Sequence, residues 1–283
     1  LKKTAPQLKW NRWLNMSGTF LAFRVDVDSP LKDVRVRRAL NMAVNKDEIV
    51  KAYYNGNAEL FAYPMHPDYV GYFQPLAEMP ASVQELFKYD PAKAKKLLAE
   101  AGYAKGFTFK TQVCSCNPDH MDLLPLVAAY LEQVGIKAEL KPTEYGAFLS
   151  AMTTRKHEAG YLMNSSHTNP TTSIRKSFIT GQTWNPSMYS DPKFDAKMDE
   201  VYKTRDEARR KQLLREMTDL FMAGPESYSE KENNQFGQIL GTVAREMATS
   251  ICASTAAVAM RESGVPSPHA RSLRPRRGRG AGS

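Results

Sequence analysis

The sequence predicts an α/β fold in which helices flank a mixed β-sheet. Residues 107–113 and 136–140 alternate apolar with polar side chains, which is typical of half-buried strands. Between them, residues 118–133 carry apolar side chains at helical spacing, and a short helix at 145–155 precedes an apolar strand at 159–163. This order of strand, helix, strand, helix and strand indicates an α/β lobe.

The elements nearer the start of the sequence fit the same fold class. Residues 19–23 are rich in Phe and flanked by Gly and Asp, so they predict a strand. Asp33 can cap a helix whose apolar stripe continues to residue 44. Asn45 and Glu48 resemble the capping box of a second helix, which Asn55 and Gly56 end.

The middle of the chain predicts a long loop followed by a helix. Residues 56–84 contain scattered prolines and aromatic side chains, and we expect an ordered loop there. Asp90 can cap a helix with Pro91 at its first position, and Gly102 supplies its left-handed end.

Two late helices are predicted at 194–202 and 206–221 from their apolar periodicity. Together the predicted helices give a candidate core, and we expect the following side chains to be buried: Leu40, Val44, Leu97, Leu98, Leu124, Val127, Leu131 and Leu214.

Length and charge are ordinary for a globular protein of one large or two modest domains. The 283 residues are 42% hydrophobic and carry a net charge of +9. The last seventeen residues hold five arginines and no acid, and removing these five charges from +9 leaves +4. The first residues lack the apolar core of a signal peptide, so we expect a processed or truncated start.

Three strings of residues resemble one protein family. They are the segment from Pro30 to Gly56, YDPAKAKKLLAEAGY at 89–103, and NPSMYSDPKFDAKMDEVYKTRDEARRKQLLREMTDLF at 185–221. These strings are similar to extracytoplasmic solute-binding proteins of family 5, the peptide-, nickel- and opine-binding receptors of ABC importers. The resemblance covers residues 19–222 and implies a periplasmic-binding-protein-like lobe of type II, with the first lobe missing.

The resemblance also implies a domain organisation and a function. Residues 1–27 would be the crossover between lobes, 28–222 the second lobe, and 223–283 an atypical basic tail. The expected function is non-catalytic: a peptide-like or other small polar solute is captured between two lobes and delivered to a membrane permease. We expect an extracytoplasmic, monomeric protein without cofactor, metal or nucleic-acid partner.

Beyond Gly224 the resemblance stops, and the tail has the low complexity of a disordered segment. We favour a reading-frame error in the coding sequence as its origin, because its composition is foreign to the rest of the chain. The alternative is a basic nucleic-acid-associated protein that acts through its arginines. Deleting residues 267–283 would abolish nucleic-acid binding only under this alternative.

Evidence for an enzyme is weak. A bridge between Cys114 and Cys116 would close a very short, strained ring, and with Cys252 the three cysteines are interpreted as structural or incidental. His66 and His120 are interpreted as surface residues. A metal-dependent hydrolase that uses Cys114, Cys116 and His120 is the best enzyme hypothesis available.

A ligand site is predicted where the strand at 159–163 ends in a polar segment, because α/β proteins hold ligands at strand ends. An ordinary polar turn is an equal alternative there. The family has an acidic cleft loop at this place, and alignment puts the uncharged Ser166 and Asn169 at its acidic positions. The candidate ligand-binding residues are Asn164, Ser165, Ser166, His167, Asn169 and Trp184, the last as an aromatic wall. They favour a neutral or anionic solute over a peptide ammonium group.

Overall fold

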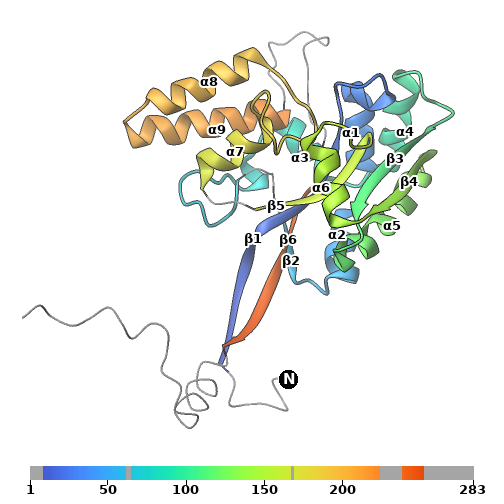
Figure 1. The fold of residues 1–283 in the computed structure, drawn as a ribbon, viewed down its shortest axis with the longest axis horizontal. Helices are drawn as coiled ribbons and strands as arrows, with labels where there is room; N and C mark the ends of the chain where they lie inside the picture. Colours follow the sequence, from blue (N-terminus) through green and yellow to red (C-terminus); the bar gives the residue numbers. More distant parts are fainter. Residues whose placement is uncertain (1–8, 62–64, 167–168, 224–237, 252–283) are drawn as a thin grey trace, which may run out of the picture. The chain divides into compact units, whose positions relative to one another are not determined.

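A computed structural model of the chain describes residues 9–61, 65–166, 169–223 and 238–251 (Figure 1). Residues 14–246 form one compact unit, and residues 1–13 with 247–283 form a second. Of the second unit, the described residues are the beginning of strand β1 (Lys9–Phe23) and the end of strand β6 (Gln238–Ile251).

The centre of the fold is a mixed sheet, as the sequence predicts. Its strands follow the order β2-β6-β1-β5-β3-β4, in which β2 is Ala58–Phe61, β3 is Phe107–Cys114, β4 is Ile136–Thr143 and β5 is Gly160–Ser166. β3 runs parallel to both β4 and β5, whereas β1 is antiparallel to β5. The carboxyl ends of β3, β4 and β5 therefore meet at one edge of the sheet.

Helix α5 (Pro118–Glu132) connects β3 to β4 and packs on both strands. Both strands begin directly after a glycine with positive φ, +73° at Gly106 and +85° at Gly135. A Cβ atom at Gly106 would lie 1.8 Å from the carbonyl oxygen of Gly135. Only glycine fits at Gly106, because any side chain there would collide with the backbone of the neighbouring strand start.

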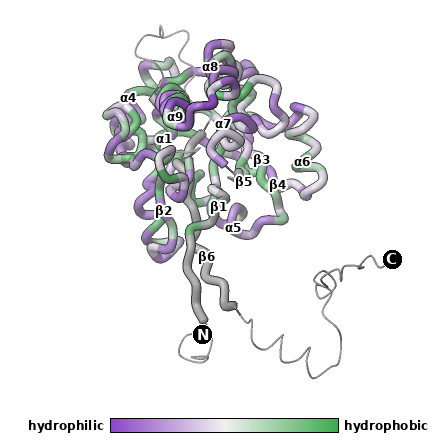
Figure 2. Tube along the Cα trace, turned by 90° about the vertical axis from the view of Figure 1, so that its left-hand side faces the viewer, coloured by the Kyte–Doolittle hydropathy of each residue, from purple (hydrophilic) through white to green (hydrophobic). Residues whose placement is uncertain are grey.

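The predicted caps are confirmed. In α1 (Val34–Ala43) the Asp33 carboxylate accepts from the amide of Arg35 at 2.8 Å. Asn45 and Glu48 exchange the two hydrogen bonds of a capping arrangement, and the helix they begin continues as α2 (Lys46–Glu48) and a π-helical segment (Ile49–Tyr53). Asp90 caps α4 (Pro91–Glu100), which packs against α1. The colouring along α4 alternates between hydrophilic and hydrophobic, as expected of an amphipathic helix (Figure 2).

The segment predicted as a long loop is more structured than expected. It contains β2 and a 3₁₀ turn (Leu76–Glu78), and helix α3 (Ala81–Phe87) begins inside it. A further helix, α7 (Pro170–Phe178), was not anticipated from the sequence. It lies beside the two late helices, α8 (Pro192–Lys203) and α9 (Glu207–Ala223) (Figure 1). These two late helices begin and end near the bounds predicted from the sequence.

The candidate core is buried with one exception. Leu40, Val44, Leu98, Leu124, Val127, Leu131 and Leu214 are buried, whereas Leu97 is only partly buried against them. The interpretation of His66 and His120 as surface residues is wrong, because both side chains are buried. Within the described residues, no helix is both long and apolar enough to cross a bilayer.

The tail was expected to be disordered, but the structure has a strand in one segment of it. Residues 238–251 form β6, and its residues 242–245 pair antiparallel with residues 58–61 of β2. The run Gln238–Val243 contains β-branched residues and provides an extended strand beside an otherwise open edge. The arginine-rich end of the chain lies outside the described residues.

Lys46 is buried in this fold, and no carboxylate of the described residues is bonded to its ammonium group. The Lys46 ammonium donates to the carbonyl oxygens of Asn41 at 2.5 Å and Leu86 at 3.1 Å, and it lies 5.6 Å from the centre of the Phe87 ring. Burial lowers the pKa of Lys46 to about 7, against a smaller opposing effect of Asp47. Folding therefore favours loss of its proton near neutral pH.

The buried face of α4 gives a direct test of the fold. We expect Leu98→Ala to lower the free energy of unfolding by roughly 2–5 kcal/mol, because it removes buried methyl groups and leaves a cavity. Leu126→Ala on α5 is the matched control, since Leu126 is 39% exposed and its truncation should cost much less. Urea unfolding measures both, and equal losses in the two variants would contradict the packing described here.

Lys46 gives a second test, through pH. In the unfolded chain Lys46 holds its proton up to the ordinary lysine pKa of 10.5, whereas the folded side chain loses it at a pKa of about 7. Between these values the unfolded state binds more protons, so the contribution of Lys46 to stability rises with pH. We expect wild-type stability, measured by urea unfolding relative to Lys46→Met, to increase from about pH 7 to about pH 9.5. A difference that does not change with pH would be inconsistent with a folded-state pKa near neutrality.

Candidate functional site

A pocket of about 230 Å³ lies where β3 and β5 reach their carboxyl ends. Carboxyl ends of parallel strands are the usual place for ligands in α/β proteins, because the loops there are free to carry binding groups. Helices α5 and α6 (Tyr145–Thr153) and the loop before α8 contribute the remaining walls. The lining residues are Cys114, Cys116, Asn117, His120, Tyr145, Phe148, Leu149, Met152, Tyr161, Met163, Asn164 and Trp184.

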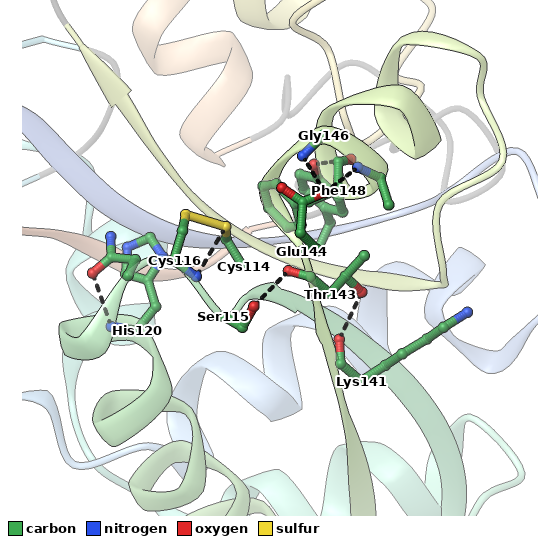
Figure 3. Close-up of a disulfide and its surroundings, with 12 residues drawn as sticks. Cys114, Ser115, Cys116, His120, Lys141, Thr143, Glu144, Gly146 and Phe148 are labelled. Carbon is green, nitrogen blue, oxygen red and sulfur yellow. Dashed lines mark hydrogen bonds between the residues drawn. A yellow bond between two sulfur atoms is a disulfide. The ribbon is translucent and has the colours of Figure 1, made fainter.

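A disulfide between Cys114 and Cys116 forms part of the wall (Figure 3). Of the two interpretations, structural or incidental, the bridge supports the structural one for Cys114 and Cys116, and the short ring that counted against a bridge is present. The turn between them is held separately, since the amide and hydroxyl of Ser115 both donate to the carbonyl oxygen of Thr143, at 2.9 and 3.2 Å. Tying the end of β3 to the end of β4 in this way keeps the two sulfur atoms close.

A polar cluster of three side chains lies at the same edge. The Asn164 carbonyl oxygen accepts from the Thr19 hydroxyl at 2.6 Å and lies 2.8 Å from His120 Nε2. Because this oxygen is an acceptor, His120 Nε2 carries the proton, and the amide NH₂ of Asn164 remains as a donor. Burial lowers the pKa of His120, although Asn164 and Asp119 act in the opposite direction, so the imidazole is neutral at neutral pH.

Aromatic rings form the opposite wall. The Phe148 and Tyr161 rings are stacked with centres 4.2 Å apart, and the Tyr161 hydroxyl donates to the Phe148 carbonyl oxygen at 2.8 Å. Tyr145 and Trp184 are 55% and 43% exposed, so their rings are available for contact. The Glu144 carboxylate caps α6 by accepting from the amides of Gly146 and Ala147 (Figure 3), and this fixes the helix that carries Tyr145 and Phe148.

The loop that carries Trp184 is held by Arg155. This guanidinium donates to the carbonyl oxygens of four residues in the loop, Gly181, Gln182, Thr183 and Asn185, at 2.7–3.4 Å. A second anchor follows directly, because Nε2 of the buried His157 lies 2.7 Å from the carbonyl oxygen of Pro186.

The backbone that carries Arg155 is in turn fixed to the end of β1. The Arg24 side chain donates to the carbonyl oxygens of Arg155 and His157, both at 3.0 Å, and pairs with Asp26. Trp184 is therefore positioned by a chain of charged-donor hydrogen bonds that begins at Arg24, directly after β1.

The structure brings two of the predicted site residues into the pocket wall, Asn164 and Trp184. Asn164–Ser166 belong to β5 rather than to a loop. Asn169 caps α7, where its side-chain oxygen accepts from the amide of Thr172, and it is absent from the pocket lining. The side chains of Ser165 and Ser166, and all of His167, lie outside the described residues, so their ligand contacts remain predictions.

Sequence reasoning missed most of the wall, in particular the turn after β3 and one face of α6. A usable signal was present: Cys114–Asn117 follow a predicted strand and precede a helix that begins with Pro118, so they occupy a strand end. While the disulfide is closed, the hydrolase alternative lacks two of its three metal ligands. Among the described residues, no three histidine, cysteine or acidic side chains group as a metal site.

Comparison with known families identifies one clear match. The sequence profile of the bacterial extracellular solute-binding proteins, family 5 (middle region), matches residues 1–186. The dipeptide-binding protein of Escherichia coli is 34% identical over 143 residues, which are 49% of this chain and 25% of that protein. The glutathione-binding protein GsiB of Pectobacterium atrosepticum is 28% identical over 223 residues, 75% of this chain and 40% of that protein. The chain thus spans well under two thirds of these relatives.

Solved structures share the fold. HbpA2 from Haemophilus parasuis superposes with a TM-score of 0.70 at 23% identity, over 87% of this chain and 46% of that one. The oligopeptide-binding protein AppA from Bacillus subtilis, in complex with a nonapeptide, gives a TM-score of 0.70 at 20% identity, over 88% of this chain and 50% of that one. The type II lobe predicted from the sequence is confirmed.

The loop anchor gives a prediction for the site. We expect Arg155→Ala to free the loop that carries Trp184, because four carbonyl oxygens lose their donor. In a background in which Trp10 and Trp13 are changed to Phe, Trp184 fluorescence should shift to the red and become more accessible to acrylamide. Lys156→Ala, at an exposed neighbour, is the control and should leave the spectrum unchanged. An unchanged spectrum in Arg155→Ala would show that the loop is held by other contacts.

Proposed function

This chain belongs to the bacterial extracellular solute-binding proteins of family 5, and from that membership we propose that it forms the second lobe of a solute receptor of an ABC importer. In this proposal the pocket at the ends of β3 and β5 is the part of the ligand site that this lobe supplies. A first lobe closes over it, and the solute is held between the two. The chain binds and releases its solute without changing it chemically.

The solute class follows from the chemistry of the wall. None of the described lining residues is Asp or Glu, so an ammonium group that entered the pocket would lose its hydration without gaining a counter-charge. The amide NH₂ of Asn164 offers a donor, which suits a carbonyl, hydroxyl or carboxylate oxygen. The rings of Tyr145 and Trp184 suit an apolar or planar group.

We therefore propose a peptide-like or other small polar solute that is not anchored by a free ammonium group at this lobe. The relatives named for dipeptide and glutathione binding support a peptide-like solute. The uncharged Ser166 and Asn169 argue against the ammonium anchor, and Asn169 is already engaged as a helix cap. A sugar or an opine-like compound meets the same requirements.

The partners follow from the same role. The loaded receptor docks on a membrane permease outside the cytoplasm and acts as a monomer, because one two-lobed molecule encloses one solute. Nucleic acid has no part in this function. The competing proposal of nucleic-acid binding depends on the arginines near the end of the chain, outside the described residues. Deletion of residues 267–283 should leave solute binding unchanged.

One observation carries the proposal: an uncharged, partly aromatic pocket occupies the strand-end position at which α/β proteins hold ligands. Isothermal titration calorimetry tests it on the chain complemented with the first lobe of a family member. We expect micromolar or tighter binding for at least one peptide, sugar or opine-like solute. N-acetylation of a bound peptide should change its affinity by less than about threefold, that is, by less than about 0.7 kcal/mol. Tight binding that acetylation abolishes would overturn the proposal that the solute is bound without an ammonium anchor.

Trp184 gives the matched mutational test. We expect Trp184→Ala to weaken solute binding at least about tenfold, because aromatic walls contribute a large share of binding energy. Tyr202→Ala is the control, since Tyr202 is 55% exposed on α8 and does not line the pocket. Equal affinities in the two variants would place the solute elsewhere on the lobe.

A further inference from the structure

We propose that the Cys114–Cys116 disulfide is a reversible thiol-exchange site, which reacts with small, uncharged thiols that enter the pocket. The solute-binding role neither requires nor predicts this reactivity. It depends on the pocket and on the disulfide in its wall, and it holds whether or not the chain serves a transporter.

The two cysteines of the bridge differ in how far each residue is exposed. Cys114 is 3% exposed at the end of β3, whereas Cys116 is an exposed residue in the turn that follows. Both line the pocket, and Figure 3 shows the bridge close to the first turn of α5. A thiol inside the pocket therefore meets the sulfur of Cys116 as its target and leaves the sulfur of Cys114 as the leaving group.

The leaving sulfur already has a hydrogen-bond donor. The amide N–H of Cys116 points to Cys114 Sγ at 3.3 Å, and this bond strengthens when the sulfur becomes an anion. Burial by itself would disfavour a thiolate at Cys114, and the amide opposes that effect. The disulfide therefore lies in a local environment that helps to bear the charge released when the bridge opens.

The thiol exchange takes place in two steps. A thiol RSH loses its proton to solvent, and the thiolate attacks Cys116 Sγ, which forms an RS–S bond and breaks the bond to Cys114 Sγ. The electron pair leaves on Cys114, which then takes a proton from water. A second thiol that attacks the mixed disulfide releases RSSR, so two thiols are oxidised while the protein disulfide is reduced to a dithiol.

The short spacing makes the exchange reversible. One residue separates the two cysteines, and Ser115 is held to Thr143 by two hydrogen bonds that do not involve sulfur. After the bridge opens, the freed Cys114 stays beside Cys116 and can attack the mixed disulfide at a high effective concentration. The adduct is therefore short-lived unless it is trapped.

The pocket selects the thiol. Its described lining has no charged side chain, and its volume is about 230 Å³, which admits a small organic thiol and excludes a polymer. The described lining has no carboxylate, so a thiol that brings an ammonium group with it gains no counter-charge there. Neutral 2-mercaptoethanol should react faster than cationic cysteamine when the rates are expressed per thiolate.

The test uses the full chain with Cys252→Ser, so that only the two pocket cysteines remain. The folded protein is mixed with 2-mercaptoethanol, quenched with acid, alkylated and mapped by peptide mass spectrometry. We expect a mercaptoethanol adduct on Cys116 and an alkylated Cys114, formed at least about tenfold faster than the same thiol reacts with oxidised glutathione. The rate of each thiol with the protein is divided by its rate with oxidised glutathione. This ratio should be at least about tenfold lower for a thiol-terminated polyethylene glycol than for mercaptoethanol.

A second variant separates pocket access from general exposure. Leu149→Trp adds bulk to the wall and should slow mercaptoethanol exchange. Circular dichroism verifies that this variant folds. If it does not fold, the comparison of the small and the polymeric thiol tests the proposal by itself. Three results would overturn the proposal: rates no faster than the reference disulfide, equal rates for the small and the polymeric thiol, or an adduct on Cys114. Two free thiols in the protein purified without reductant would also overturn it.

Discussion

Strand β5 lies between β1 and β3, and the position of Asn164 in the pocket wall depends on this double pairing. On one side Thr19 of β1 stands opposite Asn164, and on the other Val113 of β3 is paired with Leu162. Shifting β5 by one residue would turn Asn164 to the other face of the sheet and separate it from both Thr19 and His120. The polar cluster is therefore a consequence of register. It joins β1, the pocket edge and the start of α5 in a single hydrogen-bonded unit.

Several cations among the described residues hold the backbone. Arg24 and Arg155 donate to carbonyl oxygens that fix the loop of Trp184, and Lys46 and Arg37 donate to carbonyl oxygens around α1. Charged donors make stronger hydrogen bonds than neutral ones, which suits loops whose carbonyl groups lack partners in a helix or strand. The net charge of +9 therefore overstates the positive charge available to a ligand, and an uncharged pocket in a basic protein is not a contradiction.

Sequence reasoning recovered the parts of the fold that depend on local patterns. Caps such as Asp33 and Asp90, and the strands of the parallel unit, follow from neighbouring residues, so they could be predicted. The pocket could be predicted only in part, because its wall combines a turn, one face of α6 and a loop that are distant in the sequence. Asn164 and Trp184 were found through a strand end and an isolated aromatic residue. His120 was interpreted as a surface residue, or as a metal ligand in the hydrolase alternative, because its burial and its bond to Asn164 depend on tertiary packing. The disulfide was not expected, because spacing alone argued against so short a ring.

The central claim is that solute binds at the strand-end pocket of this lobe. Hydrogen–deuterium exchange with and without a solute found by calorimetry tests it most directly, because amide protection reports where contacts form. We expect the segments 114–120, 145–152 and 181–185 to gain protection together when solute is added. Protection confined to segments away from the pocket, such as 65–79 or α8, with no change in these three, would contradict it.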